Sequence, residues 1–251
     1  MNDQTCTIRG VPLGEDMPKI CIPLTGRTAE ALRRECAALK DYPFDLIEWR
    51  ADFLTDLSER EEALDTLRDC LPDAPLLGTF RTAGEGGDMP LSEAEYFSVV
   101  RWMIHTGKLD AVDLEYFHDE AERDALRDEA QAAGLIVIIS SHDFQKTPPQ
   151  EEMTARLTAM GDHGCIAKLA VMPQSVSDVA ALLAATAAVR EARPERPVIT
   201  MAMGGLGAVS RIAGETFGSA LTFGTAGQSS APGQLDARAL RQILDVLHRI
   251  K

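Results

Sequence analysis

The chain has 251 residues, 45% of them hydrophobic and 25% charged, which is enough to bury a full core. Its formal net charge of -14, with no cluster of Lys and Arg, argues against a nucleic-acid-binding protein, because phosphate binding needs a basic face. The polar start argues against a signal segment, and the lack of an apolar run of about 20 residues argues against a membrane span. The five cysteines include no C-x-x-C pair, which argues against a zinc site and predicts reduced thiols in the cytoplasm.

Short apolar runs rich in β-branched residues alternate along the chain with longer amphipathic segments. The short runs predict strands at 20–24, 46–49, 76–80, 111–114, 135–139, 165–171, 198–201 and 220–223. The longer segments predict helices at 28–40, 59–70, 92–105, 119–133, 150–160, 175–191 and 236–250. Ser92 with Glu95, and Ser175 with Asp178, have the spacing of helix starts. The seventh crossover, around 206–214, is short.

This alternation predicts an α/β fold with a parallel sheet, and eight such units in one chain favour a closed (β/α)8 TIM barrel. A doubly wound open sheet is the alternative, but the glycine pattern at Gly205, Gly207 and Ser210 lacks the third glycine of a dinucleotide fingerprint. We expect a single domain over 1–251, with residues 1–16 as an N-terminal extension that forms a hairpin across the barrel floor.

Ionisable side chains end most of the predicted strands, where barrel enzymes keep their catalytic groups. The candidates are Glu48, Arg50, Arg81, Asp113, Glu115, His142, Asp143 and Lys168, followed after the last two strands by Arg211, Ser230 and Gln234. Each also has a simpler interpretation: Glu48 and Arg50 as a surface pair, and Asp113 and Glu115 as plain strand-end carboxylates. The remaining histidines fall in helices or loops, and no second histidine lies at metal-ligand spacing.

Lys168 is the strongest candidate, because it is one of only six lysines, against nineteen arginines, and lies within an apolar strand. Burial among Ile166, Leu169 and Val171, with arginines nearby, disfavours the ammonium form. A neutral amine attacks ketones to form a Schiff base, which an arginine does not do. A lysine that reaches the barrel rim or pairs with Glu48 is the structural alternative.

An ordered set of motifs is similar to the type I 3-dehydroquinate dehydratases, the lyases of the shikimate pathway. The motifs span almost the whole chain and read FDLIEWRAD, PLLGTFRTAGEGG, VDLE, SSHDF, AKLAVMPQS, VITMAMG, SRIAGETFGSALTFG and SAPGQL. The resemblance implies a (β/α)8 barrel, a homodimer, and dehydration of 3-dehydroquinate to 3-dehydroshikimate without a metal or organic cofactor.

The resemblance also implies roles for individual residues. Lys168 would form the imine with the substrate ketone, His142 would act as general base and then acid, and Glu85 would orient that histidine. Substrate binding would fall to Glu48, Arg50, Arg81, Arg211, Ser230 and Gln234. One departure is Pro23, which stands where some members of the family have a serine able to touch the substrate; proline offers neither a hydroxyl nor a backbone N–H.

Two other functions stay open from the sequence. A Schiff-base aldolase or transaldolase-like barrel would need a phosphate cradle after the seventh and eighth strands, whereas Arg211 with Gln234 suits a carboxylate. A non-catalytic barrel scaffold would be expected to lack the lysine or the histidine, and both are present.

Overall fold

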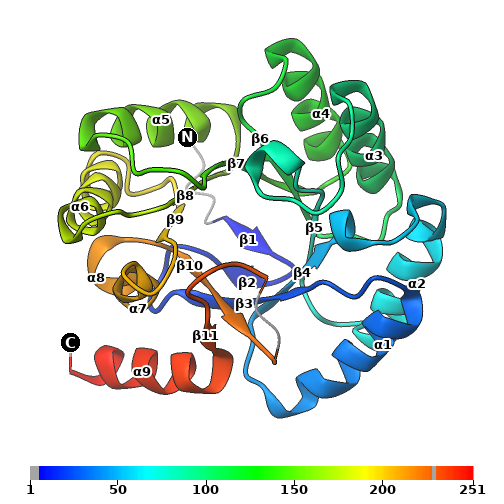
Figure 1. Ribbon diagram of the computed structural model, residues 1–251, viewed down its shortest axis with the longest axis horizontal. Coiled ribbons are helices and arrows are strands. Elements are labelled where there is room, and N and C mark those ends of the chain that lie inside the picture. Colours follow the sequence, from blue (N-terminus) through cyan, green and yellow to red (C-terminus); the bar gives the residue numbers. More distant parts are fainter. Residues whose placement is uncertain (1–5, 228–229, 251) are drawn as a thin grey trace.

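The computed structural model describes residues 6–227 and 230–250, in which parallel strands form a ring surrounded by helices (Figure 1). Neighbouring strands of the ring follow one another in sequence, and β10 lies beside β3. The seam between β9 and β10 is bridged at Val198 and Ser219, where the Ala220 N–H also donates to the Val198 carbonyl at 2.8 Å. The strands of the ring are β3 (Lys19–Leu24), β4 (Leu46–Arg50), β5 (Leu76–Thr79), β6 (Ala111–Glu115), β7 (Ile136–Asp143), β8 (Ile166–Val171), β9 (Val198–Ala202) and β10 (Leu221–Thr225). The predicted (β/α)8 barrel is confirmed.

The helices begin close to the residues that the sequence indicated. Ser92 and Ser175 both form complete capping boxes, in which the serine accepts the N–H of the third helical residue and that residue's carboxylate accepts the serine N–H. The main helices are α1 (Ala29–Ala38), α2 (Arg60–Cys70), α3 (Glu93–His105), α4 (Glu120–Ala132), α5 (Gln150–His163), α6 (Val176–Ala192) and α9 (Ala237–Arg249). The seventh crossover is short as predicted, and consists of α7 (Ala208–Ile212) and α8 (Gly214–Phe217).

Several short elements were not predicted. Two-residue β11 (Leu235–Asp236) pairs with β10, and the short 3-10 turns carry no hydrophobic period. These turns are η1 (Leu39–Asp41), η2 (Ala51–Phe53), η3 (Leu57–Glu59) and η4 (Ala83–Glu85). Strand β7 runs past Ile139 to Asp143, because the polar residues Ser140 to Asp143 pair with β8 although they break the apolar run.

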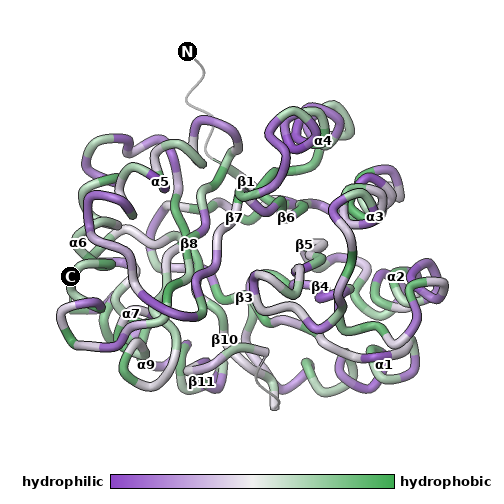
Figure 2. The backbone as a smooth tube through the Cα atoms, turned by 45° about the horizontal axis from the view of Figure 1, so that its top comes forward, coloured by the Kyte–Doolittle hydropathy of each residue, from purple (hydrophilic) through white to green (hydrophobic). Residues whose placement is uncertain are grey.

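Side chains alternate between the two faces of each strand, so the barrel has two apolar layers. Outward side chains such as Trp49, Leu169 and Val171 pack under the helices, while Ile166 and Ala170 face the barrel interior. Figure 2 shows β8 as hydrophobic over most of its length and hydrophilic stretches on α2, α3 and α4. The expectation that Leu169 and Val171 surround Lys168 is therefore wrong, because the period of the strand turns them to the opposite face.

The N-terminal extension forms the expected hairpin, from β1 (Thr7–Ile8) and β2 (Val11–Pro12). Cys6, Ile8 and Leu13 are buried in one cluster with residues near the amino ends of the ring strands, among them Leu46, Leu77, Ala111 and Ile138. Figure 1 shows the hairpin in dark blue over the centre of the ring. The hairpin therefore closes the floor of the barrel and leaves the carboxyl ends of the strands for a site. Among the described residues, no helix is both long and apolar enough to cross a membrane.

Candidate active site

A pocket opens at the carboxyl ends of the strands, and the nine residues to which the resemblance assigns a role all line it, whereas the strand-end candidates Asp113, Glu115 and Asp143 do not. The nine residues come from distant parts of the chain: β4, the segment after β5, β7, β8, α7 and the loop after β10. The barrel brings them together because every parallel strand ends at the same rim. The nine are Glu48, Arg50, Arg81, Glu85, His142, Lys168, Arg211, Ser230 and Gln234.

Lys168 is buried, with 3% of its surface exposed, and its amine points into the barrel. Nζ lies 3.2 Å from Asp113 Oδ2, 3.5 Å from Glu48 Oε1 and 4.8 Å from the centre of the Phe223 ring. Glu48 is held in turn by the Thr79 hydroxyl at 3.0 Å. The expected apolar surroundings are therefore incomplete, because two carboxylates contact the amine; the expected pairing of Lys168 with Glu48 is present.

His142 is oriented by Glu85. Its Nδ1 lies 2.9 Å from Glu85 Oε2, and its backbone N–H donates to the same oxygen at 3.1 Å. Burial lowers the pKa of His142 well below its ordinary value, and the positive charges of Arg81, Lys168 and Arg50 lower it further. Burial raises the pKa of Glu85 to about 8, against the opposing effect of Arg81. The imidazole is therefore neutral, and Nδ1 is committed to Glu85.

Arg81 is surrounded by carboxylates at the centre of the site. It donates to Asp113 at 2.8 Å, to Glu115 at 3.0 Å and to Ser140 at 3.0 Å, and lies 3.5 Å from Glu85. Burial opposes its charge, but these carboxylates raise its pKa well above the ordinary value. Burial likewise opposes the charge of Asp113, while Arg81 and Lys168 hold the pKa of that carboxyl below its ordinary value. Arg81 therefore balances the charge of the carboxylates that lie around Lys168 and His142.

Arg50 is held by a carboxylate that the sequence interpretation missed. Its Nε and Nη2 donate to the two oxygens of Asp52 at 2.8 and 2.7 Å, and its guanidinium lies over the Phe53 ring. This two-pronged pair fixes the plane of the guanidinium at the pocket wall. Asp52 is fully buried and leads directly from β4 into η2.

Arg211 has the opposite character, because it is buried without a carboxylate. Its Nη2 donates to the Pro232 carbonyl at 3.0 Å, but Nε and Nη1 have no partner among the described residues. Burial lowers the pKa of Arg211 to about 10. Two unpaired N–H donors on a buried cation form a ready site for a planar anion.

The loops after β9 and β10 meet over the pocket. Gly204 donates its N–H to the Pro232 carbonyl at 3.1 Å, and Gly233, with φ +78°, lies so close that an added Cβ would stand 2.3 Å from the Gly204 oxygen. Ser230 and Gln234 hydrogen-bond each other, with Gln234 Nε2 donating to Ser230 Oγ at 3.0 Å. Arg211 is therefore held beside these two polar groups.

Several pocket residues carried no distinctive sequence signal. The additional lining residues are Gly86, Phe144, Ala170, Met201, Met203, Phe223 and Ala231. Met203 is an example, because apolar residues near a strand end look like core until the ring is assembled. Asp52 had a usable signal, since a carboxylate two residues after Arg50 at a strand end is placed to pair with it.

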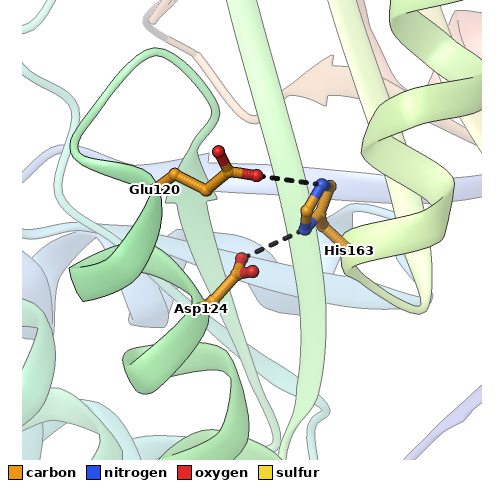
Figure 3. A group of neighbouring side chains, drawn as sticks. All are labelled: Glu120, Asp124 and His163. Atoms are coloured by element: carbon orange, nitrogen blue, oxygen red, sulfur yellow. Dashed lines mark hydrogen bonds and ion pairs between the residues drawn. The ribbon is translucent and has the colours of Figure 1, made fainter.

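One cluster outside the pocket has the residue types of a metal site: Glu120 and Asp124 on α4, and His163 at the end of α5 (Figure 3). Asp124 contacts His163 Nδ1 at 3.1 Å, whereas Glu120 contacts Nε2 at 3.7 Å, so the two carboxylates address different ring nitrogens. Arg127 lies 3.2 Å from Asp124, and Arg123 lies 3.6 Å from Glu120. Two cations already neutralise these ligands, so we interpret the cluster as an ion-pair network that joins α4 to α5.

A ring of parallel strands with its charged groups gathered at the carboxyl end is the arrangement of a (β/α)8-barrel enzyme, and the chain is of that class. Residues 20–251 match the family model of the type I 3-dehydroquinases. The chain is 47% identical over 246 residues to the 3-dehydroquinate dehydratase of Listeria welshimeri, covering 96% of this chain and 97% of that one. It is also 47% identical over 248 residues to the enzyme of Syntrophotalea carbinolica, covering 97% and 98% of the two chains.

Solved structures give the same result. The type I 3-dehydroquinate dehydratase of Clostridium difficile superposes with a TM-score of 0.94 at 40% identity, over 99% of both chains. The Enterococcus faecalis 3-dehydroquinate dehydratase superposes with a TM-score of 0.89 at 39% identity, over 96% of this chain and 98% of that one. The chain belongs to the type I 3-dehydroquinase family, and the aldolase and scaffold alternatives are set aside.

Proposed function

We propose that the protein dehydrates 3-dehydroquinate to 3-dehydroshikimate through an imine on Lys168, with His142 as the proton carrier. The observation that carries the proposal is the convergence of a buried amine, a neutral imidazole and an unpaired guanidinium on one pocket. A keto acid needs an anion site for its carboxylate, an amine for its ketone and a base beside the carbon that loses a proton.

Imine formation begins when the neutral Lys168 amine attacks the ketone carbon; a proton leaves nitrogen, water leaves carbon, and a protonated imine results. Asp113 and Glu48, within 3.5 Å of Nζ, are positioned to accept and return the protons of this step. They also balance the iminium charge in a site where charges are poorly screened by water. No metal or organic cofactor is needed, because the iminium itself accepts the electron pair released at C2.

Elimination then needs one group that takes a proton from C2 and gives it to the C1 hydroxyl. We assign His142 the tautomer in which Nδ1, 2.9 Å from Glu85 Oε2, carries the proton; Nε2 then keeps a free lone pair for the C2 proton. The electron pair moves toward the iminium nitrogen to form an enamine, which expels the C1 hydroxyl as water when imidazolium Nε2–H protonates it. Hydrolysis of the imine releases the enone acid and restores Lys168.

Substrate orientation falls to Arg211, whose Nε and Nη1 keep N–H donors free for the carboxylate. Glu48, Arg50, Arg81, Ser230 and Gln234 line the remaining wall and are assigned to the ring hydroxyls and to the carboxylate edge. Arg81 acts mainly through its neighbours, since its Nη atoms already donate to protein partners.

The test combines an absorbance assay with covalent trapping. Conversion of 3-dehydroquinate to its conjugated enone acid raises the ultraviolet absorbance, and borohydride added during turnover reduces the imine to a stable amine. Mass mapping is expected to find the reduced ligand on the peptide that contains Lys168. No absorbance change with 3-dehydroquinate would remove the proposed reaction, and label on another lysine would remove Lys168 from it.

Lys168→Ala is the matched control for the trapping experiment. It removes the amine and leaves Asp113, Glu48 and the rest of the barrel in place, so we expect a folded protein without label. Equal labelling in this variant would mean that a different lysine forms the imine.

We also propose that the protein is a cytoplasmic homodimer. Its five cysteines are all free thiols, in keeping with a reducing compartment. The outer face of α9 exposes Ile243, Val246, Leu247 and Ile250, and Leu206 and Val209 lie exposed next to it on and before α7. An apolar stripe of this length on a helix surface is typical of an interface, and its spacing fits a second copy of the same helix running antiparallel.

A further inference from the structure

We infer that Asp52 is a positioning residue that couples the substrate-binding side of the pocket to the proton-transfer side. The inference rests on the proposed function and extends it to a residue that does not line the pocket. Asp52 is fully buried in η2, directly after β4, and four donors converge on its two carboxylate oxygens.

The donors divide evenly between the two oxygens. Oδ1 accepts from Arg50 Nε at 2.8 Å and from the Arg81 backbone N–H at 3.3 Å. Oδ2 accepts from Arg50 Nη2 at 2.7 Å and from the Asp88 backbone N–H at 3.1 Å. Each oxygen therefore holds one nitrogen of the guanidinium and one end of the segment 81–88.

The segment between these two ends carries Glu85. It closes on itself, because Glu85 N–H and Gly87 N–H both donate to the Thr82 carbonyl at 3.0 and 2.8 Å. An added Cβ at Gly87 would stand only 1.8 Å from the Arg81 oxygen, so the segment admits glycine alone at this position. Asp52 ties the ends of a tight loop together, and the loop holds the carboxylate that orients His142.

A second set of hydrogen bonds holds the loop that carries Glu85. Asp52 is therefore expected to affect the position of Glu85 more than the stability of the protein. Glu115 accepts the Thr82 N–H at 2.8 Å and the Thr82 hydroxyl at 2.7 Å, which holds the start of the loop from the other side. With Glu115 intact, loss of Asp52 frees the Asp88 end and the guanidinium of Arg50 while the loop stays attached. The expected consequence is a misplaced Glu85 and a slower proton transfer in a folded enzyme.

The variant that tests the inference is Asp52→Asn. Whichever way the amide turns, its NH2 group replaces one oxygen and faces two donors, so one guanidinium nitrogen and one end of the segment lose their acceptor. We expect kcat to fall by about 10- to 100-fold, with a smaller rise in KM, as loss of hydrogen bonds between charged groups implies. Borohydride trapping at Lys168 should persist, because the amine does not depend on the loop.

The decisive readout is the kinetic isotope effect with substrate deuterated at C2. Slower proton abstraction should raise this isotope effect in Asp52→Asn. The double variant Asp52→Asn with Glu85→Gln should lose less activity than the sum of the single changes, because both residues act through His142.

Asp88→Asn is the matched control. It makes the same exchange on a half-exposed carboxylate paired with Arg27, and it keeps the backbone N–H that donates to Asp52. Its kcat and isotope effect should match those of the wild type.

Wild-type kinetics and isotope effect in a folded Asp52→Asn would overturn the inference, while leaving the proposed function intact. Failure of the wild type itself to convert 3-dehydroquinate would overturn the proposed function instead. If Asp52→Asn does not fold, hydrogen exchange of the wild type decides: the Arg81 and Asp88 amides should be protected together, and rapid exchange of both would exclude the clamp.

Discussion

Arg211 differs from Arg50 and Arg81, the other arginines of the pocket, because it is buried with unpaired donors. Leaving buried hydrogen-bond donors without partners costs about 1–3 kcal/mol, and Arg211 leaves two, Nε and Nη1, in that state. Arg50 and Arg81 are comparably buried, but each has carboxylate partners. The difference supports the proposal that Arg211 binds the substrate carboxylate, and it is visible only in the structure.

The first prediction follows from this difference. Arg211→Met keeps an unbranched apolar stem and removes the unpaired donors, so we expect the melting temperature to rise while kcat/KM falls by about 100-fold or more. Thermal unfolding without ligand and steady-state kinetics measure the two effects. A variant that is both less stable and fully active would contradict the role of Arg211.

The second prediction concerns His142. His142→Ala removes the only imidazole that lines the pocket, as far as the described residues show, but leaves Lys168 and its carboxylates unchanged. We expect the imine to form and to be trapped by borohydride, while turnover falls by about 10²–10⁴-fold. Turnover near that of the wild type would remove His142 from the reaction.

At the scale of elements, the sequence predicted the ring strands and main helices because their signals are local. Apolar runs and the capping serines at 92 and 175 depend only on neighbours in sequence. Asp52, and Asp113 as a partner of Lys168, were missed because those contacts join η2 to the 81–88 segment and β6 to β8. Contacts between strands become visible only when the ring is closed.

The third prediction concerns the junction of α3, β6 and α4. His118 precedes α4, stacks on the Tyr96 ring at 4.4 Å and lies 3.0 Å from both Glu115 and Glu93. Burial lowers its pKa, but the hydrogen bonds to Glu115 and Glu93 outweigh burial and raise that pKa above the ordinary value. The imidazole of His118 therefore binds its proton more tightly in the folded chain than in the unfolded chain.

The sign of the pH dependence follows from the raised pKa. His118 contributes its full stabilisation below the unfolded pKa of about 6.5, and this contribution is lost as the pH rises through the folded pKa. We expect His118→Gln to cost about 1 kcal/mol more at pH 5.5 than at pH 9. Urea unfolding of both proteins at the two pH values measures the difference; a constant cost would mean that packing on Tyr96, and not charge, is what His118 provides.

The residues that stabilise the barrel floor and the residues of the proposed site lie at opposite ends of the barrel axis. The hairpin closes the floor with a dry apolar cluster, while the charged pocket occupies the opposite rim. Ile8, fully buried in that floor, tests the separation. We expect Ile8→Ala to cost about 2–5 kcal/mol of unfolding free energy and to leave kcat and KM of the folded enzyme unchanged, as measured below the onset of unfolding. A fall in kcat in the folded variant would show that the floor is coupled to the site.

The apolar face of α9 is the surface at which we propose that two copies of the protein pair. If two copies of α9 pair antiparallel about a twofold axis between Val246 and Leu247, Ile243 of each copy lies opposite Ile250 of the other and Asp245 lies opposite His248.

Val246 is 52% exposed in the isolated chain, so Val246→Glu leaves the fold unchanged but buries an unpaired charge in the paired state. Light scattering after gel filtration should give a dimer for the wild type and a monomer for Val246→Glu. Val176→Glu, the same exchange at a residue 73% exposed at the start of α6, should remain dimeric. A dimer that survives Val246→Glu would place the interface elsewhere, and a monomeric wild type would exclude the homodimer.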